Sequence, residues 1–112
     1  MKKIMISDKM EKTIRHIDNE AMENEGMKKV LRAIYIAISL LEHMDSTSDL
    51  NNVKKIVGEN MYVLKVDSKL RMVFTESEME DGTRTYIILD VFKYDDYRKF
   101  LENKGTVNDL MS

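Results

Sequence analysis

The spacing of apolar residues changes once along the chain, and this change restricts the fold more than any other feature. From Met10 to Met44, apolar residues recur at intervals of three and four, which is the period of an amphipathic helix. After Gly58 they recur at every second position, which is the period of a strand. The sequence therefore predicts an α+β domain in which two helices are followed by an antiparallel sheet.

The helical part of the chain divides into two apolar stripes. Residues 2–7 alternate weakly and predict a short strand at the N-terminus. Asp8 followed by Glu11 resembles a capping box, so a helix is expected to begin there. The break at 24–26 separates the two helices, which are expected to form a hairpin. The predicted core residues are Met10, Ile14, Ile17 and Ala21 in the first helix and Met27, Val30, Leu31, Ile34, Ile38 and Leu41 in the second, with Met44 as a possible last member.

The later part of the chain is typical of a three-stranded meander that ends in a helix. Polar residues at 45–52 favour a loop, and Asp81-Gly82 predicts a hairpin turn. Lys104-Gly105 is a helix stop, after which residues 105–112 are expected to form a flexible tail. The predicted strands are Tyr62–Val66, Leu70–Phe74 and Tyr86–Phe92, and the predicted helix is Asp95–Asn103.

Length and composition predict a single domain over residues 1–112, because 43% hydrophobic residues provide enough apolar surface for one core. The chain has no cysteine, which excludes a disulfide framework and a cysteine nucleophile. The most apolar stretch, 30–41, is too short to cross a bilayer and contains Arg32. The first residues lack the apolar core of a signal peptide. We therefore expect a cytoplasmic protein with no membrane partner.

The pairing register of the first two strands of the meander places two cations side by side. A three-residue turn at 67–69 sets Tyr62, Leu64 and Val66 opposite Phe74, Met72 and Leu70, which gives one apolar face. The same register places Lys65 opposite Arg71 on the other face, turned away from the core. Like charges at opposed positions cost stability, so the pair favours a bound anion such as phosphate.

Two alternatives to an anion site remain open for this pair. Lysine and arginine on the outer face of a strand commonly serve solubility and discourage edge pairing. Asp67 and Glu76 lie close in sequence, and they could pair with the two cations in a solvated charge network.

The strands also carry a resemblance to a known family. The stretch from Ile56 through Tyr62-Val63-Leu64-Lys65-Val66, and then Leu70-Arg71-Met72-Val73-Phe74, resembles the strand pattern of RelE/ParE-type toxins of type II toxin-antitoxin systems. A third apolar strand, 87–91, runs into Lys93, Tyr94 and Tyr97, as the family's third strand runs into basic residues and a tyrosine. The two preceding helices complete a similarity in element order over nearly the whole chain.

The resemblance implies a metal-independent endoribonuclease that cuts messenger RNA on the ribosome by attack of the 2′-hydroxyl on the adjacent phosphate. Lys65 and Arg71 match the family's basic strand residues and would stabilise charge in the transition state. Tyr97 matches the terminal tyrosine and would stack on a base or orient the 2′-hydroxyl. Lys93 or Tyr94 lies where the family places a further basic or histidine residue. The resemblance identifies no general base.

Ordinary structural roles compete with these assignments. Tyr97 and Tyr94 could pack the last helix, since Tyr97 lies three positions before Phe100, and Lys93 could be a strand-end cation. His16 and His43 have no second ligand at metal spacing, so they are interpreted as surface residues. No metal and no cofactor is expected.

The charge of the chain departs from that of ribosome-dependent members, which are usually strongly basic, whereas this chain has a net charge of -2. A ParE-like inhibitor of DNA gyrase that cuts no RNA is therefore the chief alternative. A catalytically inactive binding module of the same fold is a third reading. The resemblance implies a cognate antitoxin as partner, besides the ribosome and messenger RNA or gyrase. Methionines such as Met27 or Met44 could contribute to the antitoxin surface.

Overall fold

The computed structural model describes residues 3–44, 53–56, 60–78 and 80–104. The elements along the chain are β1 (Lys3–Ile6), α1 (Asp8–Ala21), α2 (Glu25–His43), β2 (Val53–Ile56), β3 (Met61–Lys65), β4 (Leu70–Glu78), β5 (Arg84–Lys93) and α3 (Tyr94–Lys104). This order confirms the predicted α+β class, the helical hairpin and the C-terminal helix. The loop predicted at 45–52 and the tail predicted at 105–112 lie outside the described residues.

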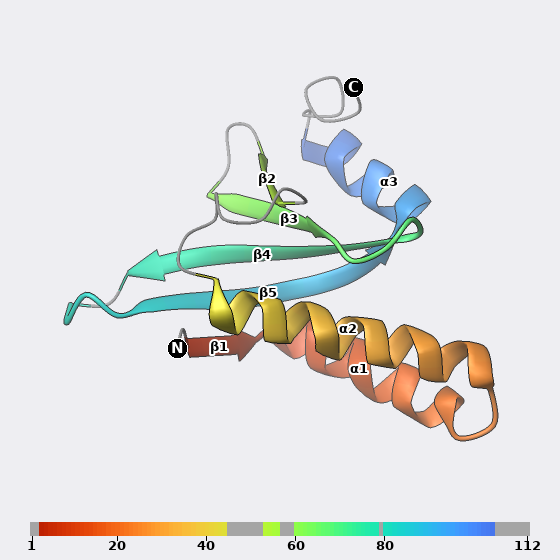
Figure 1. The fold of residues 1–112 in the computed structure, drawn as a ribbon. Helices are drawn as coiled ribbons and strands as arrows, with labels where there is room; N and C mark the ends of the chain where they lie inside the picture. The colour runs from red at the N-terminus through yellow and green to blue at the C-terminus, as the bar shows by residue number, and fades with distance from the viewer. Residues whose placement is uncertain (1–2, 45–52, 57–59, 79, 105–112) are drawn as a thin grey trace.

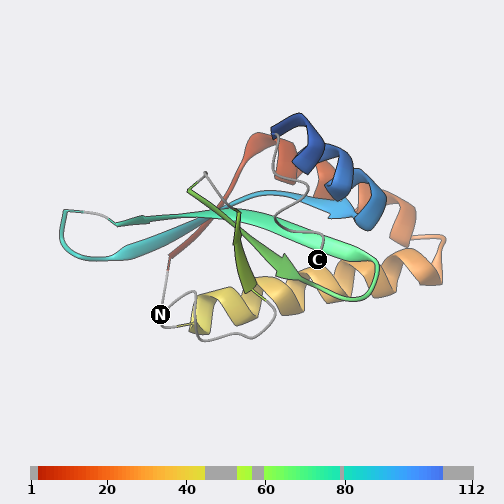
Figure 2. The same ribbon diagram turned by 90° about the horizontal axis from the view of Figure 1, so that it is seen from above.

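The strands form one five-stranded sheet in the order β1-β5-β4-β3-β2. β1 pairs with β5 in parallel, and the other neighbours pair antiparallel. The helical hairpin of α1 and α2 lies along one side of the sheet (Figure 1). Seen from above, α2 and α3 lie on opposite sides of it (Figure 2). The sheet is therefore the middle layer of the domain.

Strand β2 extends the predicted three-stranded meander by one strand. It pairs with β3 from Val53 opposite Leu64 to Ile56 opposite Met61. Its two central residues, Lys54 and Lys55, are exposed, so the period of two is hidden in a four-residue segment. Lysines are common on edge strands because they discourage pairing with another chain. Charge at the edge of the sheet thus obscured a strand that hydrophobic spacing alone could not identify.

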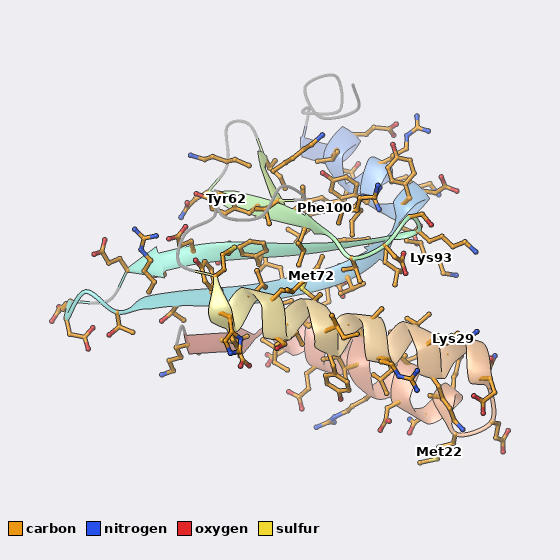
Figure 3. The ribbon with its side chains drawn as sticks, in the orientation of Figure 1. Met22, Lys29, Tyr62, Met72, Lys93 and Phe100 are labelled. Atoms are coloured by element: carbon orange, nitrogen blue, oxygen red, sulfur yellow. The ribbon has the colours of Figure 1, made fainter. Side chains whose placement is uncertain are left out.

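Two hydrophobic clusters lie on the two faces of the sheet. The first cluster joins the helical hairpin to the sheet, and it contains Met10, Ile17, Ile34, Ala37, Leu41, Met44, Leu64, Met72, Phe74, Tyr86 and Ile88. The second joins α3 to the other face, and it contains Ile56, Val63, Val73, Tyr97 and Leu101. Figure 3 places Met72 on the side of α2 and Phe100 on the side of α3. The predicted helical stripes are confirmed, but the face expected to point away from the core carries a core of its own.

The start of α1 is capped by Ser7 and not by Asp8 as predicted. The Ser7 hydroxyl accepts a hydrogen bond from the amide of Met10 at 3.0 Å, and it donates one to the carbonyl of Leu89 at 2.6 Å. A serine at this position satisfies a free amide of the first helical turn. The same hydroxyl also fastens the helix to β5, which is a tertiary contact that the sequence does not predict.

The buried carboxylate of Asp90 forms a second contact between α1 and β5. The β4–β5 register shifts at Val73 and Phe74, and next to this shift Asp90 is only 6% exposed. Its Oδ1 accepts from the Thr13 hydroxyl at 2.8 Å, and Lys9 Nζ lies 3.7 Å from Oδ2. A buried carboxylate needs such partners. The C-terminal half of β5, which leads into the candidate site, is thereby held in place.

Candidate functional site

The register that brings Lys65 and Arg71 together is confirmed. Lys65 is paired with Arg71 across β3 and β4, next to the apolar pair of Leu64 and Met72. The amide of Val66 donates to the carbonyl of Leu70 at 3.1 Å, which closes the predicted three-residue turn at 67–69. Lys65 is exposed and Arg71 is half-buried. The two cations therefore share the face on which α3 packs, beyond the edge of its hydrophobic cluster.

The turn holds the guanidinium group of Arg71 in a fixed place. Asp67 Oδ1 accepts from the amides of Lys69 at 2.8 Å and Leu70 at 2.9 Å. Arg71 Nη1 donates to the carbonyls of Asp67 at 2.7 Å and Leu70 at 3.0 Å. A guanidinium group has five N–H donors, and these bonds within the described chain occupy Nη1. Its Nη2 and Nε donors are placed by the turn and can serve a ligand.

For Arg71, the suggested charge network with Asp67 and Glu76 takes a different form in the structure. The side chain of Asp67 is used by the amides of the turn, and Arg71 contacts the Asp67 carbonyl oxygen, not its carboxylate. Glu76 pairs with Arg84, with 3.0 Å between Oε1 and Nη1. Within the described residues, neither acid forms an ion pair with Arg71.

Tyr94 lies over the guanidinium group, with 5.0 Å between Arg71 Cζ and the ring centroid. Tyr94 is 36% exposed, and its amide donates to the carbonyl of Lys69 at 2.8 Å. A cation is attracted to the face of an aromatic ring, and this contact also limits the motion of both groups. The first residue of α3 therefore presents an exposed aromatic ring beside the cationic pair.

Tyr97 lies behind this surface and is only 5% exposed, within the second hydrophobic cluster. The sequence left two roles open for Tyr97, packing of the last helix and contact with RNA. The burial of Tyr97 supports packing. Burial raises the pKa of Tyr97 above the ordinary value of a tyrosine, and the positive charge of Arg71 opposes this shift. The phenol is therefore protonated at neutral pH, and it faces the field of Arg71 from the interior.

Lys93 lies on the opposite face of the sheet from Lys65 and Arg71. It is paired with Leu70 across β4 and β5, one position away from the pair of Arg71 and Phe92. Successive side chains on a strand point to opposite faces, so Lys93 leaves the face of Lys65 and Arg71. It lies at the end of the sheet where β5 meets α3 (Figure 3). The structure thus brings together Lys65, Arg71, Tyr94 and Tyr97. It places Lys93 on the other face of the sheet from Arg71.

The acidic tip of the β4–β5 hairpin lies at the opposite end of the hairpin from Arg71. The acidic end carries Glu76, Glu78, Glu80 and Asp81. Arg71 lies seven residues before Glu78 on β4, which corresponds to about 23 Å. Screening in physiological salt acts over about 8 Å. These four acids are therefore too far away to cancel the charge at Arg71, although Asp67, Asp95 and Asp96 lie at the same end of the hairpin as Arg71.

A second candidate surface, which the sequence interpretation missed, lies on the outer side of α2. Tyr35, Ile36 and Leu40 are 53%, 57% and 43% exposed, although all three are large and apolar. Lys28 and Arg32 continue the same surface toward the start of the helix. We call these five residues the α2 strip. A signal was present in the sequence, because the three apolar residues fall off the predicted buried stripe of α2.

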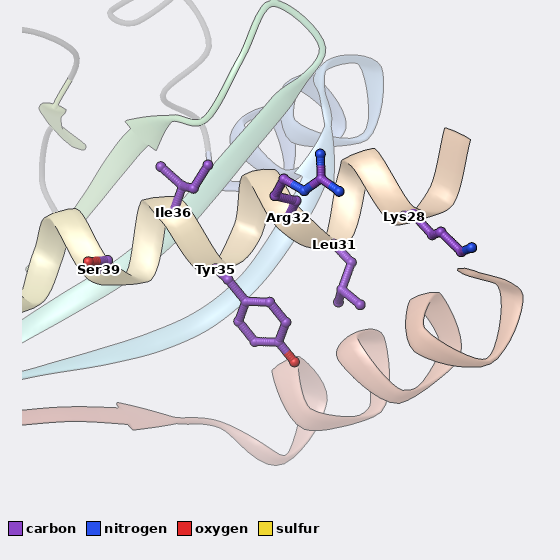
Figure 4. A pocket seen from close by; sticks show the side chains of 6 residues that line it. All are labelled: Lys28, Leu31, Arg32, Tyr35, Ile36 and Ser39. Atoms are coloured by element: carbon purple, nitrogen blue, oxygen red, sulfur yellow. The ribbon is translucent and has the colours of Figure 1, made fainter. Parts of the chain in front are cut away.

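All residues of the α2 strip except Leu40 line a shallow groove of about 450 Å³, together with Leu31 and Ser39 (Figure 4). A smaller hollow of about 140 Å³ continues it, and Ile36 and Leu40 line this hollow together with Leu64, Lys65 and Val66. The α2 strip therefore extends to Lys65, the member of the cationic pair that lies on β3.

Both histidines are exposed side chains of the helices, as predicted. His16 Nε2 lies 3.0 Å from Glu20 Oε1, and His43 Nδ1 lies 2.8 Å from the carbonyl oxygen of Ser39. No group of three or more metal-binding side chains occurs in the described part of the chain. No described helix is long and apolar enough to cross a membrane.

No protein-family model and no curated protein sequence matches the chain. Two solved structures resemble it. The YoeB/ParE toxin from Agrobacterium tumefaciens has a TM-score of 0.63 at 8% identity, covering 82% of this chain and 98% of that one. The YoeB dimer from Staphylococcus aureus has a TM-score of 0.56 at 15% identity, covering 83% of this chain and 95% of that one. The chain therefore has the fold of the YoeB/ParE toxin structures.

Proposed function

We propose that the chain is the toxin of a toxin-antitoxin pair and that it cuts messenger RNA on the ribosome. The observation that carries this proposal is the pairing of Lys65 with Arg71 beside the exposed ring of Tyr94. A guanidinium group and an ammonium group bind phosphate, and an exposed aromatic ring stacks on an unpaired base. One surface of the fold therefore offers both contacts that a single RNA strand requires.

The proposed chemistry is attack of a 2′-hydroxyl on the neighbouring phosphate, with departure of the 5′-oxygen. Negative charge grows on the phosphate oxygens in the transition state, and donors fixed in advance stabilise that charge most. Arg71 meets this requirement because the turn and Tyr94 hold its guanidinium group on two sides. Lys65 adds a second, more mobile cation. Tyr97 acts as a positioning residue for Arg71 and Tyr94, because it is buried behind them.

The separation of charge supports RNA binding in spite of the net charge of -2. Contact with a phosphate depends on the local potential, and the acidic tip of the hairpin lies about two to three screening lengths from Arg71. The acidic tip also restricts orientation, because it is repelled by the phosphates that attract the other end. An RNA strand is therefore expected to approach the end of the sheet where β3, β4 and α3 meet.

The net charge favours one other candidate function, a ParE-like inhibitor of DNA gyrase that cleaves no nucleic acid. Nuclease action on the ribosome requires docking among phosphates, whereas gyrase is a protein target. A catalytically inactive binding module is the remaining reading of the same fold. The three functions are separated by which cellular process stops first.

A cognate antitoxin is part of the proposal, and the α2 strip is the surface proposed to bind it. Exposed large apolar side chains in a row are typical of a protein interface. Lys28 and Arg32 at one end of the strip would attract acidic residues of the partner. Because the hollow at its other end reaches Lys65, a segment lying on the strip would also cover one member of the cationic pair. Binding and neutralisation would then be one event.

The proposal is tested by inducing the chain in a bacterium and following the incorporation of labelled amino acids and thymidine. We expect growth to stop, and protein synthesis to fall before DNA synthesis does. Prior loss of DNA synthesis would favour gyrase inhibition and would refute the nuclease assignment. Unchanged growth at a verified level of folded protein would refute the toxin assignment itself.

The same assay tests the antitoxin surface when the product of the adjacent gene is co-expressed. Co-expression is expected to restore growth. Ile36→Asp places a carboxylate in the α2 strip and should still arrest growth, but it should no longer be rescued. Lys12→Asp, an exposed position on α1, is the matched control that should remain rescued. Full rescue of both variants would exclude the α2 strip as the antitoxin surface.

A further inference from the structure

A cavity of about 370 Å³ lies at the end of the sheet, where Tyr94 forms part of its lining and Arg71 does not. Its volume falls within the range of small-molecule pockets, roughly 300–1,000 Å³. It is formed where α2, the β3–β4 turn and the start of α3 come together, and it is lined by Val30, Asp67, Ser68, Lys69, Leu70, Lys93, Tyr94 and Asp95. It includes Lys93, the predicted site residue that the sheet register separates from Arg71.

The walls of this cavity are fixed by hydrogen bonds. The amide of Tyr94 donates to the carbonyl of Lys69 at 2.8 Å, which joins the start of α3 to the turn. The turn is closed by the Asp67 carboxylate, whose Oδ1 accepts from the amides of Lys69 and Leu70. A cavity with walls placed in advance loses little entropy when a ligand binds.

The chemistry of the lining suits a ligand with a flat ring and a single phosphate group. Val30, Leu70 and the ring of Tyr94 provide an apolar surface, and Lys69 and Lys93 provide two ammonium groups that are both exposed to solvent. Asp67 and Asp95 balance these charges, which disfavours a di- or triphosphate. A single nucleotide unit of RNA has a planar base and one phosphate, and it matches this lining.

We propose that this cavity is a subsite for the nucleotide that neighbours the cleaved phosphate, with its base against Tyr94 and its phosphate between Lys69 and Lys93. Tyr94 connects the two sites, because Arg71 lies 5.0 Å from its ring centroid while the same residue lines the cavity. The RNA strand would thus turn around the end of the sheet. This placement on a substrate strand rests on the proposed nuclease function, whereas the binding of a nucleotide can be measured without it.

The test is a titration of the isotope-labelled full-length chain with adenosine 5′-monophosphate, uridine 5′-monophosphate or inorganic phosphate, followed by amide chemical shifts. We expect both nucleotides to shift the amides of Val30, Ser68, Lys69 and Tyr94 in a saturable manner. Phosphate alone at the same concentration should shift these amides at least fivefold less. Shifts confined to other surfaces, or equal shifts with phosphate alone, would overturn the subsite.

Variants separate the subsite from the fold and from the cleavage site. Lys69→Ala should weaken nucleotide binding about two- to fivefold, the effect of one exposed charge contact. Tyr94→Ala should weaken it at least about fivefold through lost stacking, and Tyr94→Phe should retain it. Val30→Phe fills the cavity without a change of charge and should abolish binding, whereas Lys12→Ala on α1 should have no effect. Unchanged affinity in the folded Lys69→Ala and Tyr94→Ala variants would exclude the proposed ligand pose.

The outcomes distinguish this inference from the proposed function. Nucleotide binding in the cavity by a chain that cleaves no RNA would keep the subsite and remove the nuclease. RNA cleavage by a chain in which nucleotides do not bind at the cavity would keep the nuclease and remove the subsite.

Discussion

Replacing both Lys65 and Arg71 with alanine is expected to reduce RNA cleavage by about a thousandfold. Removal of one fixed donor to an oxyanion costs about a hundred- to a thousandfold in rate, and this variant removes the fixed guanidinium group together with its neighbour. The fold should persist, because Lys65 is exposed and Arg71 lies outside both hydrophobic clusters. The measurement is the rate of cleavage of a ribosome-bound message by purified protein, with circular dichroism to verify folding.

The matched control for this variant replaces Lys12 and Arg15 with alanine. Both are exposed on α1, and together they remove the same two types of charge. The control should cleave at the wild-type rate within about twofold, because the pair of Arg15 and Glu11 lies on the exposed surface of α1. Equal loss in the two variants would mean that net charge, and not the geometry at β3 and β4, determines activity. Retained cleavage by the site variant would refute the assignment.

Phe74→Ala is expected to lower the free energy of unfolding by about 3–5 kcal/mol, the usual cost of a fully buried phenylalanine. Phe74 is 0% exposed and lies between two aromatic rings, with 5.6 Å to the centroid of Tyr62 and 5.5 Å to that of Tyr86. A loss of this size is a large part of the roughly 5–15 kcal/mol that stabilises a small domain. The measurement is the midpoint of urea unfolding.

Tyr35→Ala is the matched control for stability, because Tyr35 is also aromatic but is 53% exposed on α2. It should change the free energy of unfolding by less than about 0.5 kcal/mol, as is usual for surface positions. A small effect of Phe74→Ala would contradict the register that directs Phe74 into the first hydrophobic cluster. That register also aligns Lys65 with Arg71, so the two predictions test the same pairing from opposite faces.

The pairing of β3 with β4 was predictable because two constraints agree. The apolar residues of both strands must share a face, and a turn of three residues is the length that achieves this. The position of Lys65 opposite Arg71 then follows from the alternation of strand side chains. The helical stripes were predictable for a similar reason, since residues such as Met10 and Leu41 recur at the helical period and are fully buried.

What the sequence did not predict depends on contacts between distant segments. Ser7 replaces Asp8 as the helix cap because its hydroxyl also reaches the carbonyl of Leu89 in β5. The second hydrophobic cluster arises because α3 folds back over Val63 and Val73, which alternate with the residues of the first cluster. Single-sequence periodicity identifies one buried face of a strand, and it does not reveal that a later helix covers the other.

The sequence predicted that Lys65 lies opposite Arg71, but it did not predict which of the two tyrosines is exposed or that Lys93 lies on the other face. The motif resemblance assigned the stacking role to Tyr97, yet the exposed ring belongs to Tyr94, because the first turn of α3 directs Tyr97 inward. The separation of Lys93 from Arg71 follows from one residue of strand register. That difference leaves Lys93 beside the cavity, where we propose that it binds the neighbouring nucleotide.

The most direct test of the account is the chemistry of the RNA ends produced by the purified chain on a ribosome-bound message. Attack by the 2′-hydroxyl beside Lys65 and Arg71 predicts a 2′,3′-cyclic phosphate on one fragment and a 5′-hydroxyl on the other. A message with a single 2′-deoxynucleotide at the cleavage position should remain intact. Fragments with 5′-phosphate ends, cleavage of the 2′-deoxy message, or an uncut message with the folded protein bound would contradict it.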